Sequence, residues 1–130
     1  MISVVINTYN AEQHLRKVLE SVKGFDEIVI CDMESTDGTL EIAKEYGCKT
    51  VCFPKKDYTI VEPARNFAIQ QASHEWVLVV DADELVPPAL KDYLYNIISD
   101  NTSDTHGIYI PRRNYFMGTF MHSLYPDYIL

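Results

Sequence analysis

Basic residues are scarce in this sequence of 130 residues. Lys and Arg number 11 against 19 Asp and Glu, which gives a formal net charge of -8. A protein that binds duplex nucleic acid needs clustered Lys and Arg to displace counterions, and the sequence has no such cluster. Nucleic acid is therefore not an expected partner. The net charge also opposes adhesion of this segment to anionic lipid.

Cysteine is sparse too, and long apolar runs are absent. The three cysteines, Cys31, Cys48 and Cys52, are odd in number and form no Cys-x-x-Cys pair, so neither a disulfide framework nor a zinc site is expected. No apolar stretch reaches the roughly 20 residues that a transmembrane segment needs, and no signal peptide precedes the first apolar run. We expect a cytoplasmic protein, with any membrane contact peripheral and on the inner face of the membrane.

Short apolar runs rich in β-branched residues alternate with helical patterns. The predicted strands are 2–7, 27–32, 50–53, 76–80 and 107–110, and the predicted helices follow the first four of them, with Asn10 and Gln13 capping the first helix. This order predicts an α/β fold, a mostly parallel sheet with helices on both faces, in a single domain 1–130. After the last predicted strand we expect an irregular, aromatic tail.

Polar clusters follow three predicted strands at their carboxyl ends, which is where open α/β sheets bind ligands. The first is 7–10 (NTYN), the second is 32–39 (DMESTDGT) and the third is 81–84 (DADE). Because the carboxyl ends of parallel strands meet at one edge of the sheet, these clusters predict one ligand site at that edge.

The segment 81–84 is the sharpest of the three, because five apolar residues lead directly into three carboxylates. Desolvation and mutual repulsion oppose ionisation there, and a hard divalent cation with oxygen ligands relieves both. Alternation along an extended chain points Asp81 and Asp83 the same way. We therefore predict that one holds a ribose hydroxyl while the other meets a metal on a diphosphate. The alternative is that Asp83 and Glu84 merely favour the dipole of the following helix.

Four further side chains are candidates for the same site. Asp32 is predicted to contact a base, with a turn-capping role as the alternative, and Asp37 and Thr39 are expected only to cap turns and start the second helix. Thr8 and Tyr9 offer a hydroxyl and a stacking face to a base, although Tyr9 suits the wall of a crevice equally well. Arg65 offers a fork of donors to a diphosphate, or it is an exposed helix arginine.

Together these segments resemble family 2 of the glycosyltransferases, which are inverting enzymes of the GT-A fold. The matching segments lie in the family's order and spacing and cover most of the chain: 4–10 (VVINTYN), 32–39 (DMESTDGT), 64–66 (ARN) and 79–84 (VVDADE). The resemblance implies a Rossmann-like GT-A sandwich of three layers. It also implies a donor-binding part at about 1–100 and the start of an acceptor region at about 107–130.

The resemblance also implies roles by position, all toward a nucleotide-sugar donor. They are Thr8, Tyr9 and Asp32 at the nucleoside, Arg65 at the diphosphate, Asp81 at the ribose, and Asp83 as a ligand of Mn2+ or Mg2+. Many relatives carry a second acid where this chain has Met33. This departure bears on the base contact and hence on a preference for uridine.

The tail is similar to a narrower group, the lipopolysaccharide-core β-glucosyltransferase-like proteins, through 110–116 (IPRRNYF) and 125–128 (YPDY). This implies transfer of a sugar, with a UDP-sugar as the expected donor, to a glycan or lipid-linked acceptor in cell-surface polysaccharide or lipopolysaccharide synthesis. Asp127 is the predicted catalytic base, and its alternative is a structural carboxylate in a Pro-Asp turn. Since the family continues past this point, we expect a C-terminally truncated chain.

Three other functions compete with this one. A sugar-phosphate nucleotidyltransferase needs a glycine-rich loop after the first strand, where 7–10 contains no glycine. A receiver-type signalling domain needs an acidic pair there and a lysine after the last strand, and the sequence has neither. A fragment that binds nucleotide sugar without turnover remains open, and the sequence carries no signal for an oligomeric state.

Overall fold

The structure, a computed structural model, describes residues 1–54, 62–99, 107–113 and 116–122. Strands and helices alternate in the order β1 (Ile2–Thr8), α1 (Glu12–Ser21), β2 (Glu27–Asp32), α2 (Thr39–Glu45), β3 (Lys49–Cys52), α3 (Glu62–Gln70), β4 (Trp76–Asp81), α4 (Pro88–Ser99), β5 (Gly107–Arg113) and β6 (Phe116–His122). The predicted α/β fold is confirmed. None of the described helices is both long and apolar enough to cross a membrane.

The six strands form one sheet in the order β3-β2-β1-β4-β6-β5. The first four are parallel, while β6 is antiparallel to both β4 and β5. In the register of the sheet, Thr8 lies opposite Asp32 and Asn7 lies opposite Asp81. The polar clusters that follow β1, β2 and β4 therefore do meet at one edge of the sheet, which we call the carboxyl edge.

The prediction for the tail was wrong in one respect. The segment expected to be irregular contains β6, which pairs with β4 and separates β4 from β5 in the sheet. Its sequence, FMGTFMH, alternates poorly between apolar and polar residues and carries a glycine. The strand forms because β4 offers it a partner from a distant part of the chain, and a local sequence pattern does not reveal such a partner.

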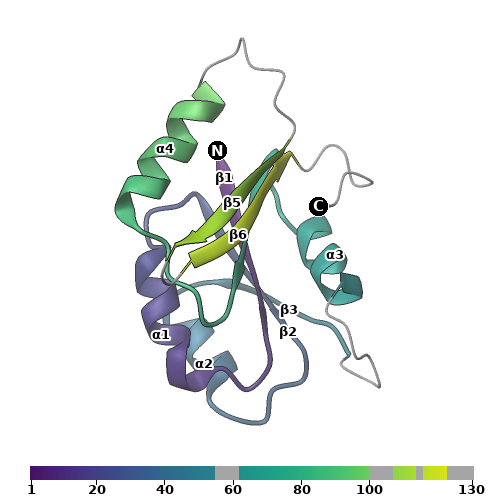
Figure 1. The fold of residues 1–130 in the computed structure, drawn as a ribbon. Helices are drawn as coiled ribbons and strands as arrows, with labels where there is room; N and C mark the ends of the chain where they lie inside the picture. Colours follow the sequence, from purple (N-terminus) through teal and green to yellow (C-terminus); the bar gives the residue numbers. More distant parts are fainter. Residues whose placement is uncertain (55–61, 100–106, 114–115, 123–130) are drawn as a thin grey trace.

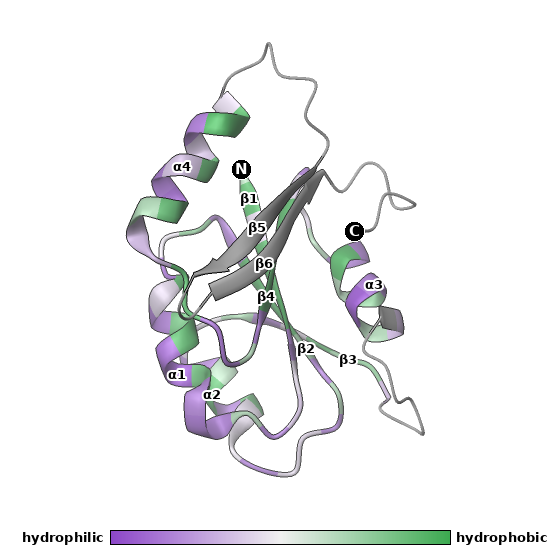
Figure 2. Ribbon diagram, in the orientation of Figure 1, coloured by the Kyte–Doolittle hydropathy of each residue, from purple (hydrophilic) through white to green (hydrophobic). Residues whose placement is uncertain are grey.

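Helices cover both faces of the sheet, with α1, α2 and α4 on one side and α3 on the other (Figure 1). Alternate residues of each parallel strand pack on opposite faces of the sheet. Val4 and Ile6 pack with the first helix group, whereas Val5 packs with α3. Figure 2 shows the resulting contrast between apolar strands and helices with one polar side. Each fully buried aliphatic side chain in these cores contributes about 1.5–3 kcal/mol.

The predicted cap of the first helix was also wrong. Asn10 has a φ of 48°, so it lies in the left-handed region, and the residue at the N-cap position is Ala11. The side chain of Asn10 does not turn back on α1. Its Oδ1 accepts a hydrogen bond from the Thr36 N–H at 2.8 Å, in the loop that follows β2. Asparagine suits this position because its short polar side chain tolerates left-handed backbone.

Candidate functional site

Two loops at the carboxyl edge hold each other in place. Hydrogen bonds are donated in both directions between the loop after β1 and the loop after β2. The N–H of Asn10 donates to Ser35 Oγ at 2.8 Å, and the N–H of Gly38 donates to Glu12 Oε2 at 2.8 Å. Asp37 accepts the N–H of Glu12 at 3.2 Å, which satisfies one of the unpaired amides at the start of α1. This network of hydrogen bonds fixes the backbone that carries the candidate residues.

Asp37 has the structural role that the sequence predicted for it. Its carboxylate accepts the hydroxyl and the N–H of Thr39, and the hydrogen bond from the hydroxyl lowers the pKa of Asp37 below its ordinary value. An ionised Asp37 is the better acceptor for the amides at the start of both helices. The prediction that this part of the 32–39 segment caps turns is therefore confirmed.

Asp32 lies at the end of β2 with no exposed surface. Its Oδ1 accepts the hydroxyls of Thr8, at 2.7 Å, and Ser35, at 2.6 Å, and its Oδ2 accepts the N–H of Ser35 at 2.8 Å. Three donors from the protein thus surround the carboxylate, as buried charges require. Thr8 is also buried, whereas Tyr9 is 44% exposed at the same edge. The structure brings Thr8 and Asp32 into direct contact and leaves Tyr9 accessible.

The turn after β4 differs from the extended chain that the sequence argument assumed. The N–H of Glu84 donates to the carbonyl of Asp81 at 3.0 Å, so the chain turns at once after the strand. Glu84 is only 2% exposed and accepts the N–H of Asp81 at 3.1 Å, whereas Asp83 is exposed in the turn. The inference that strand alternation aims Asp81 and Asp83 the same way is therefore wrong, because Asp83 is not in the strand. Both carboxylates nevertheless stand at the carboxyl edge.

Arg65 reaches Asp81 from α3. The Nη2 of Arg65 lies 3.3 Å from Oδ1 of Asp81, and the two side chains are 31% and 47% exposed. Three buried side-chain atoms have no hydrogen-bond partner among the described residues: Asn7 Nδ2, Arg65 Nε and Asn66 Oδ1. Buried polar atoms are nearly always paired in native proteins. Asn7 lies opposite Asp81 in the sheet and Asn66 follows Arg65 in α3, so these atoms are candidates for contact with a ligand.

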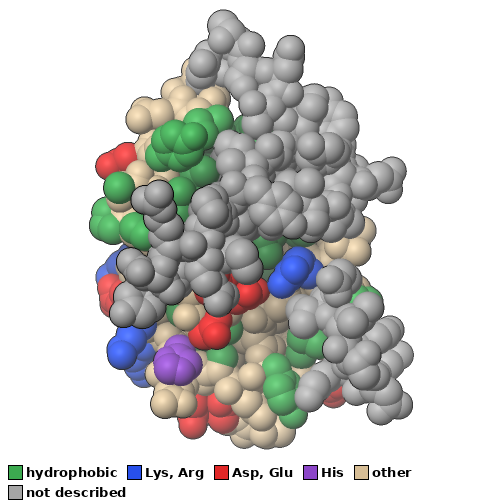
Figure 3. Space-filling model, viewed as in Figure 1, with side chains coloured by type: hydrophobic (Ala, Val, Ile, Leu, Met, Phe, Trp, Pro, Cys, Tyr) green, Lys and Arg blue, Asp and Glu red, His purple; other side chains and the backbone are tan. Residues whose placement is uncertain are grey.

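The predicted site residues divide between the two sides of the sheet. Thr8 and Asp32 belong to the side that packs α1 and α2, whereas Asn7 and Asp81 belong to the side of α3, as the alternation of core residues and the contact with Arg65 show. The two groups approach each other only at the carboxyl edge. Figure 3 shows acidic and basic side chains close together near the middle of one face. A ligand that uses both groups must lie across the edge of the sheet.

The donor set at this edge fits a divalent cation that is held partly by substrate. No group of three His, Cys, Asp or Glu side chains forms a metal cage within the parts of the chain that the structure describes. Mg2+ is usually bound by one or two carboxylates together with substrate phosphates rather than by such a cage. Asp81 and Asp83 are two carboxylates at this edge, one half-exposed and one exposed. Asp127 lies outside the described residues.

Other features of the molecule do not join the site. Burial raises the pKa of the Cys31 thiol to about 11, so it stays protonated at neutral pH and is not a nucleophile. An open hollow of about 600 Å³ on the α1 surface contains none of the predicted residues. It is lined by Arg16, Lys17, Glu20, Ser21, Tyr46 and Leu85.

Three residues of the predicted segments were given no ligand-binding role from the sequence. Asn7 and Asn66 each bury a polar atom that has no partner among the described residues, and Glu84 is a buried carboxylate. The sequence did carry a signal for Asn7, because it is a polar residue that directly follows an apolar run. In the structure both of its neighbours in the chain, Ile6 and Thr8, are buried. For Asn66 the sequence offered only its place beside Arg65.

Curated proteins include relatives of this chain. The chain is 35% identical over 109 residues to an uncharacterized glycosyltransferase of Rickettsia typhi, covering 83% of the chain and 36% of the relative. It is 31% identical over 119 residues to the lipopolysaccharide core biosynthesis glycosyltransferase LpsC of Rhizobium meliloti, covering 90% of the chain and 44% of that protein. The chain thus spans well under half the length of these relatives.

Solved structures share the fold. S. aureus TarS 1–349 matches with a TM-score of 0.74 and 25% identity, over 97% of this chain and 48% of that one. A mannosyltransferase of Pyrobaculum calidifontis, in complex with GDP-Man and Mn2+, matches with a TM-score of 0.62 and 26% identity, over 82% of this chain and 33% of that one. The model of the glycosyl transferase family 2 matches residues 3–124, nearly the whole sequence. The chain therefore belongs to glycosyltransferase family 2.

Proposed function

We propose that this chain is the donor-binding part of an inverting, metal-dependent glycosyltransferase. In this proposal it takes a sugar from a UDP-sugar and passes it to a glycan or lipid-linked acceptor. The observation that carries the proposal is the Arg65–Asp81 pair at the carboxyl edge, in which the buried Nε of Arg65 has no partner among the residues that the structure describes. The net charge of -8 repels a diphosphate, so a bridging cation and local donors must hold it.

The roles follow from where the side chains stand. The exposed ring of Tyr9 is a stacking surface for the base, and Thr8 and Asp32 support the backbone beneath it through their mutual hydrogen bond. The Oδ2 of Asp32 accepts one hydrogen bond and has capacity for another. Because Asp32 has no exposed surface, its contact with a base requires a local movement that exposes the carboxylate. On the other side of the sheet, Arg65 binds the diphosphate and Asp81 binds the ribose.

Mn2+ or Mg2+ is the proposed cofactor, with Asp83 as its main protein ligand and Asp81 beside it. When bound, such a cation neutralises charge on the departing diphosphate. The exposure of Asp83 in the turn suits a ligand that shares its cation with substrate. The mannosyltransferase that resembles this chain is in complex with GDP-Man and Mn2+, which supports a divalent cation here.

Asp127 is the proposed base that takes the proton from the acceptor hydroxyl, a role worth about 10²–10⁴ in rate. In-line attack by that hydroxyl on the anomeric carbon breaks the bond to the diphosphate and inverts the configuration. The likeness to LpsC supports an acceptor in lipopolysaccharide core synthesis. We also place the protein in the cytoplasm, since all three cysteines are free thiols.

Titration calorimetry with UDP-glucose, with and without Mn2+, tests the proposal. We expect binding that depends on Mn2+ in the parent protein and its loss in Asp83→Asn, which removes the charge and keeps the shape of the side chain. Asp92→Asn is the matched control, because Asp92 is an exposed aspartate on α4 away from the carboxyl edge. Equal binding by the parent and by Asp83→Asn would refute the assignment of Asp83.

A binding fragment without turnover is the second candidate, and the observation that favours it is length. The chain covers only 36% and 44% of the two relatives described above. A donor-hydrolysis assay separates the two functions. Release of UDP at a rate that falls in an Asp127→Asn variant supports catalysis by this chain. Donor binding with no release of UDP supports the fragment.

A further inference from the structure

The ion pair between Arg65 and Asp81 is longer, and has fewer hydrogen bonds, than a usual arginine–carboxylate pair. Arginine and carboxylate groups commonly pair through two parallel hydrogen bonds of about 2.7–2.9 Å. Here one nitrogen, Nη2, approaches one oxygen, Oδ1, at 3.3 Å. The Nε of the same guanidinium is buried and has no acceptor among the described residues. Arg65 therefore has unused hydrogen-bonding capacity in this state.

Asp81 is in a similar position. Its side chain is 47% exposed, so one side of the carboxylate faces solvent while Arg65 lies against Oδ1. A cation that approaches this carboxylate meets the positive guanidinium close by, and the repulsion reduces its affinity. Asn7, opposite Asp81 in the sheet, adds a second buried donor that has no partner in the described parts of the chain. Arg65 Nε and Asn7 Nδ2 are thus two donors available to an incoming acceptor.

A bound diphosphate supplies acceptors to Arg65 and draws its guanidinium away from Asp81. Phosphate oxygens match the planar fork of a guanidinium and carry more charge than a carboxylate. Once Arg65 turns to phosphate, its Nε gains access to an acceptor and Asp81 loses its positive neighbour. The carboxylate is then available to a cation or a ribose hydroxyl.

We infer that Arg65 is a latch on Asp81: it withholds this carboxylate from the divalent cation until a diphosphate takes up the guanidinium. This inference rests on the proposed function. It adds an order to it: without nucleotide the cation has only Asp83 and is held weakly, and the diphosphate releases Asp81 as the second carboxylate. Arg65 acts here through Asp81, as a positioning residue, in addition to its contact with the diphosphate.

The test measures binding of Mn2+ without nucleotide, by the loss of the free-ion signal in electron paramagnetic resonance. We expect weak binding by the parent protein and binding at least fivefold tighter by Arg65→Gln. The same variant should bind UDP in the presence of Mn2+ at least tenfold more weakly than the parent. Arg65→Met gives the same comparison if the glutamine variant does not fold.

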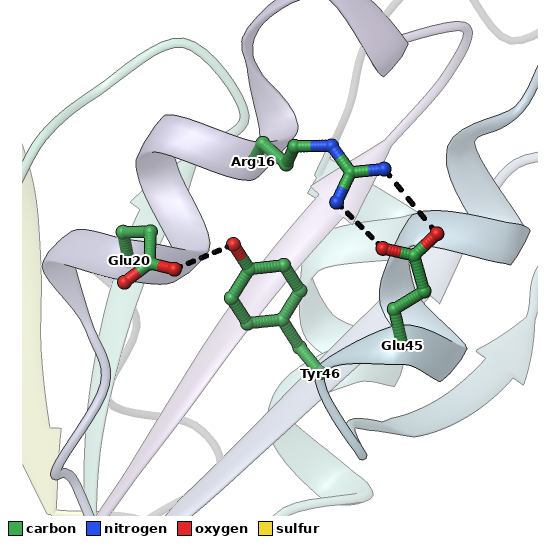
Figure 4. A network of polar contacts seen from close by, with 4 residues as sticks. All are labelled: Arg16, Glu20, Glu45 and Tyr46. Atoms are coloured by element: carbon green, nitrogen blue, oxygen red, sulfur yellow. Dashed lines mark hydrogen bonds and ion pairs between the residues drawn. The ribbon is translucent and has the colours of Figure 1, made fainter.

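Arg16→Gln is the matched control. Arg16 pairs with Glu45 on the surface of α1 and α2, through two contacts at 2.5 and 3.2 Å, in the network shown in Figure 4. Its replacement removes the same positive charge from an acidic protein but leaves the carboxyl edge intact. We expect Mn2+ binding by Arg16→Gln to equal that of the parent. In the double variant Arg65→Gln with Asp81→Asn, the gain in affinity should vanish.

The outcomes separate this inference from the proposed function. If the parent binds UDP with Mn2+ but Arg65→Gln gains no affinity for Mn2+ alone, the latch is wrong and the proposed function stands. An equal gain in Arg16→Gln also refutes the latch, since net charge then explains the effect. If the parent binds neither UDP nor a UDP-sugar in the presence of Mn2+, both fail.

Discussion

Two polar residues on one side of β1 show how a single strand can carry both structure and function. Ser3 and Asn7 are four residues apart and face the side of α3. Ser3 is fully buried and donates to Glu27 Oε1 at 2.8 Å, so its hydroxyl is satisfied. The Nδ2 of Asn7 is buried without a partner among the described residues. An unpaired buried donor costs about 1–3 kcal/mol, so Asn7 lowers stability where Ser3 does not.

This contrast predicts opposite effects for the same substitution. Asn7→Val removes the unpaired amide and places a β-branched residue in a buried strand, so we expect the free energy of unfolding to rise by about 1 kcal/mol. Binding of UDP-glucose with Mn2+ should weaken at least threefold. Urea denaturation and calorimetry measure the two quantities.

Ser3→Val is the control for this prediction. It removes a satisfied hydrogen bond and leaves Glu27 with one donor fewer, so we expect a loss of about 1 kcal/mol in stability and unchanged donor binding. If Asn7→Val destabilises the protein as Ser3→Val does, then Asn7 is a structural residue whose partner lies in another part of the chain.

At the scale of single residues, the sequence predicts which residues lie at the carboxyl edge better than it predicts how their side chains are placed. The run of apolar residues before Asp81 indicates correctly that the carboxylate ends a buried strand. It does not indicate that the chain turns immediately and leaves Asp83 outside the strand, because the deciding hydrogen bond joins the backbone of Glu84 to that of Asp81. Likewise, the sequence does not reveal that Thr8 and Ser35 occupy the carboxylate of Asp32.

At the scale of elements, the parallel part of the sheet was predictable and its completion was not. Strand β4 is apolar on both faces and stands between helical patterns, so local sequence is sufficient to identify it. The position of β6 depends on pairing with β4 across some 40 residues of chain, as the partner residues Val77 and Met121 show. The start of α1 depends in the same way on a loop from the next βα unit.

The amino end of the sheet carries a pH-sensitive contact that the function does not use. Burial alone would raise the pKa of Glu27, but hydrogen bonds from Ser73 and Ser3 outweigh it and lower the pKa below its ordinary value of 4.5. A carboxylate with a lowered pKa in the folded state stabilises the protein above the unfolded value. That contribution is lost as the pH falls from about 4.5 through the folded value.

We therefore expect the free energy of unfolding to fall as the pH is lowered from 5 to about 3, and to fall less in Glu27→Gln. Urea denaturation at several pH values measures the slope. Glu41→Gln, at an exposed position on α2, is the control and should keep the slope of the parent protein. Identical slopes in the parent and in Glu27→Gln would show that the hydrogen bonds from Ser73 and Ser3 do not distinguish the two protonation states.

At the scale of the whole molecule, net charge and ligand binding act on the same equilibrium. A chain with 19 acidic and 11 basic residues repels a nucleoside diphosphate, and the pair of Arg65 with Asp81 disfavours a lone cation. Neither ligand alone should stabilise the fold much. Together they neutralise each other and bind the folded state, which raises its stability by mass action.

The magnitude of this effect can be calculated in advance. A ligand present at 100 times its dissociation constant contributes about 2.7 kcal/mol, which for a domain of this size corresponds to a rise in Tm of about 8–10 °C. We expect that rise for UDP or a UDP-sugar with Mn2+, and less than about 2 °C for either component alone. A larger rise with GDP-sugars would overturn the preference for uridine, on which the replacement of a second acid by Met33 bears. A rise with Mn2+ alone would instead contradict the coupling between Arg65 and Asp81, because Asp83 should hold the ion only weakly while Asp81 is paired with Arg65.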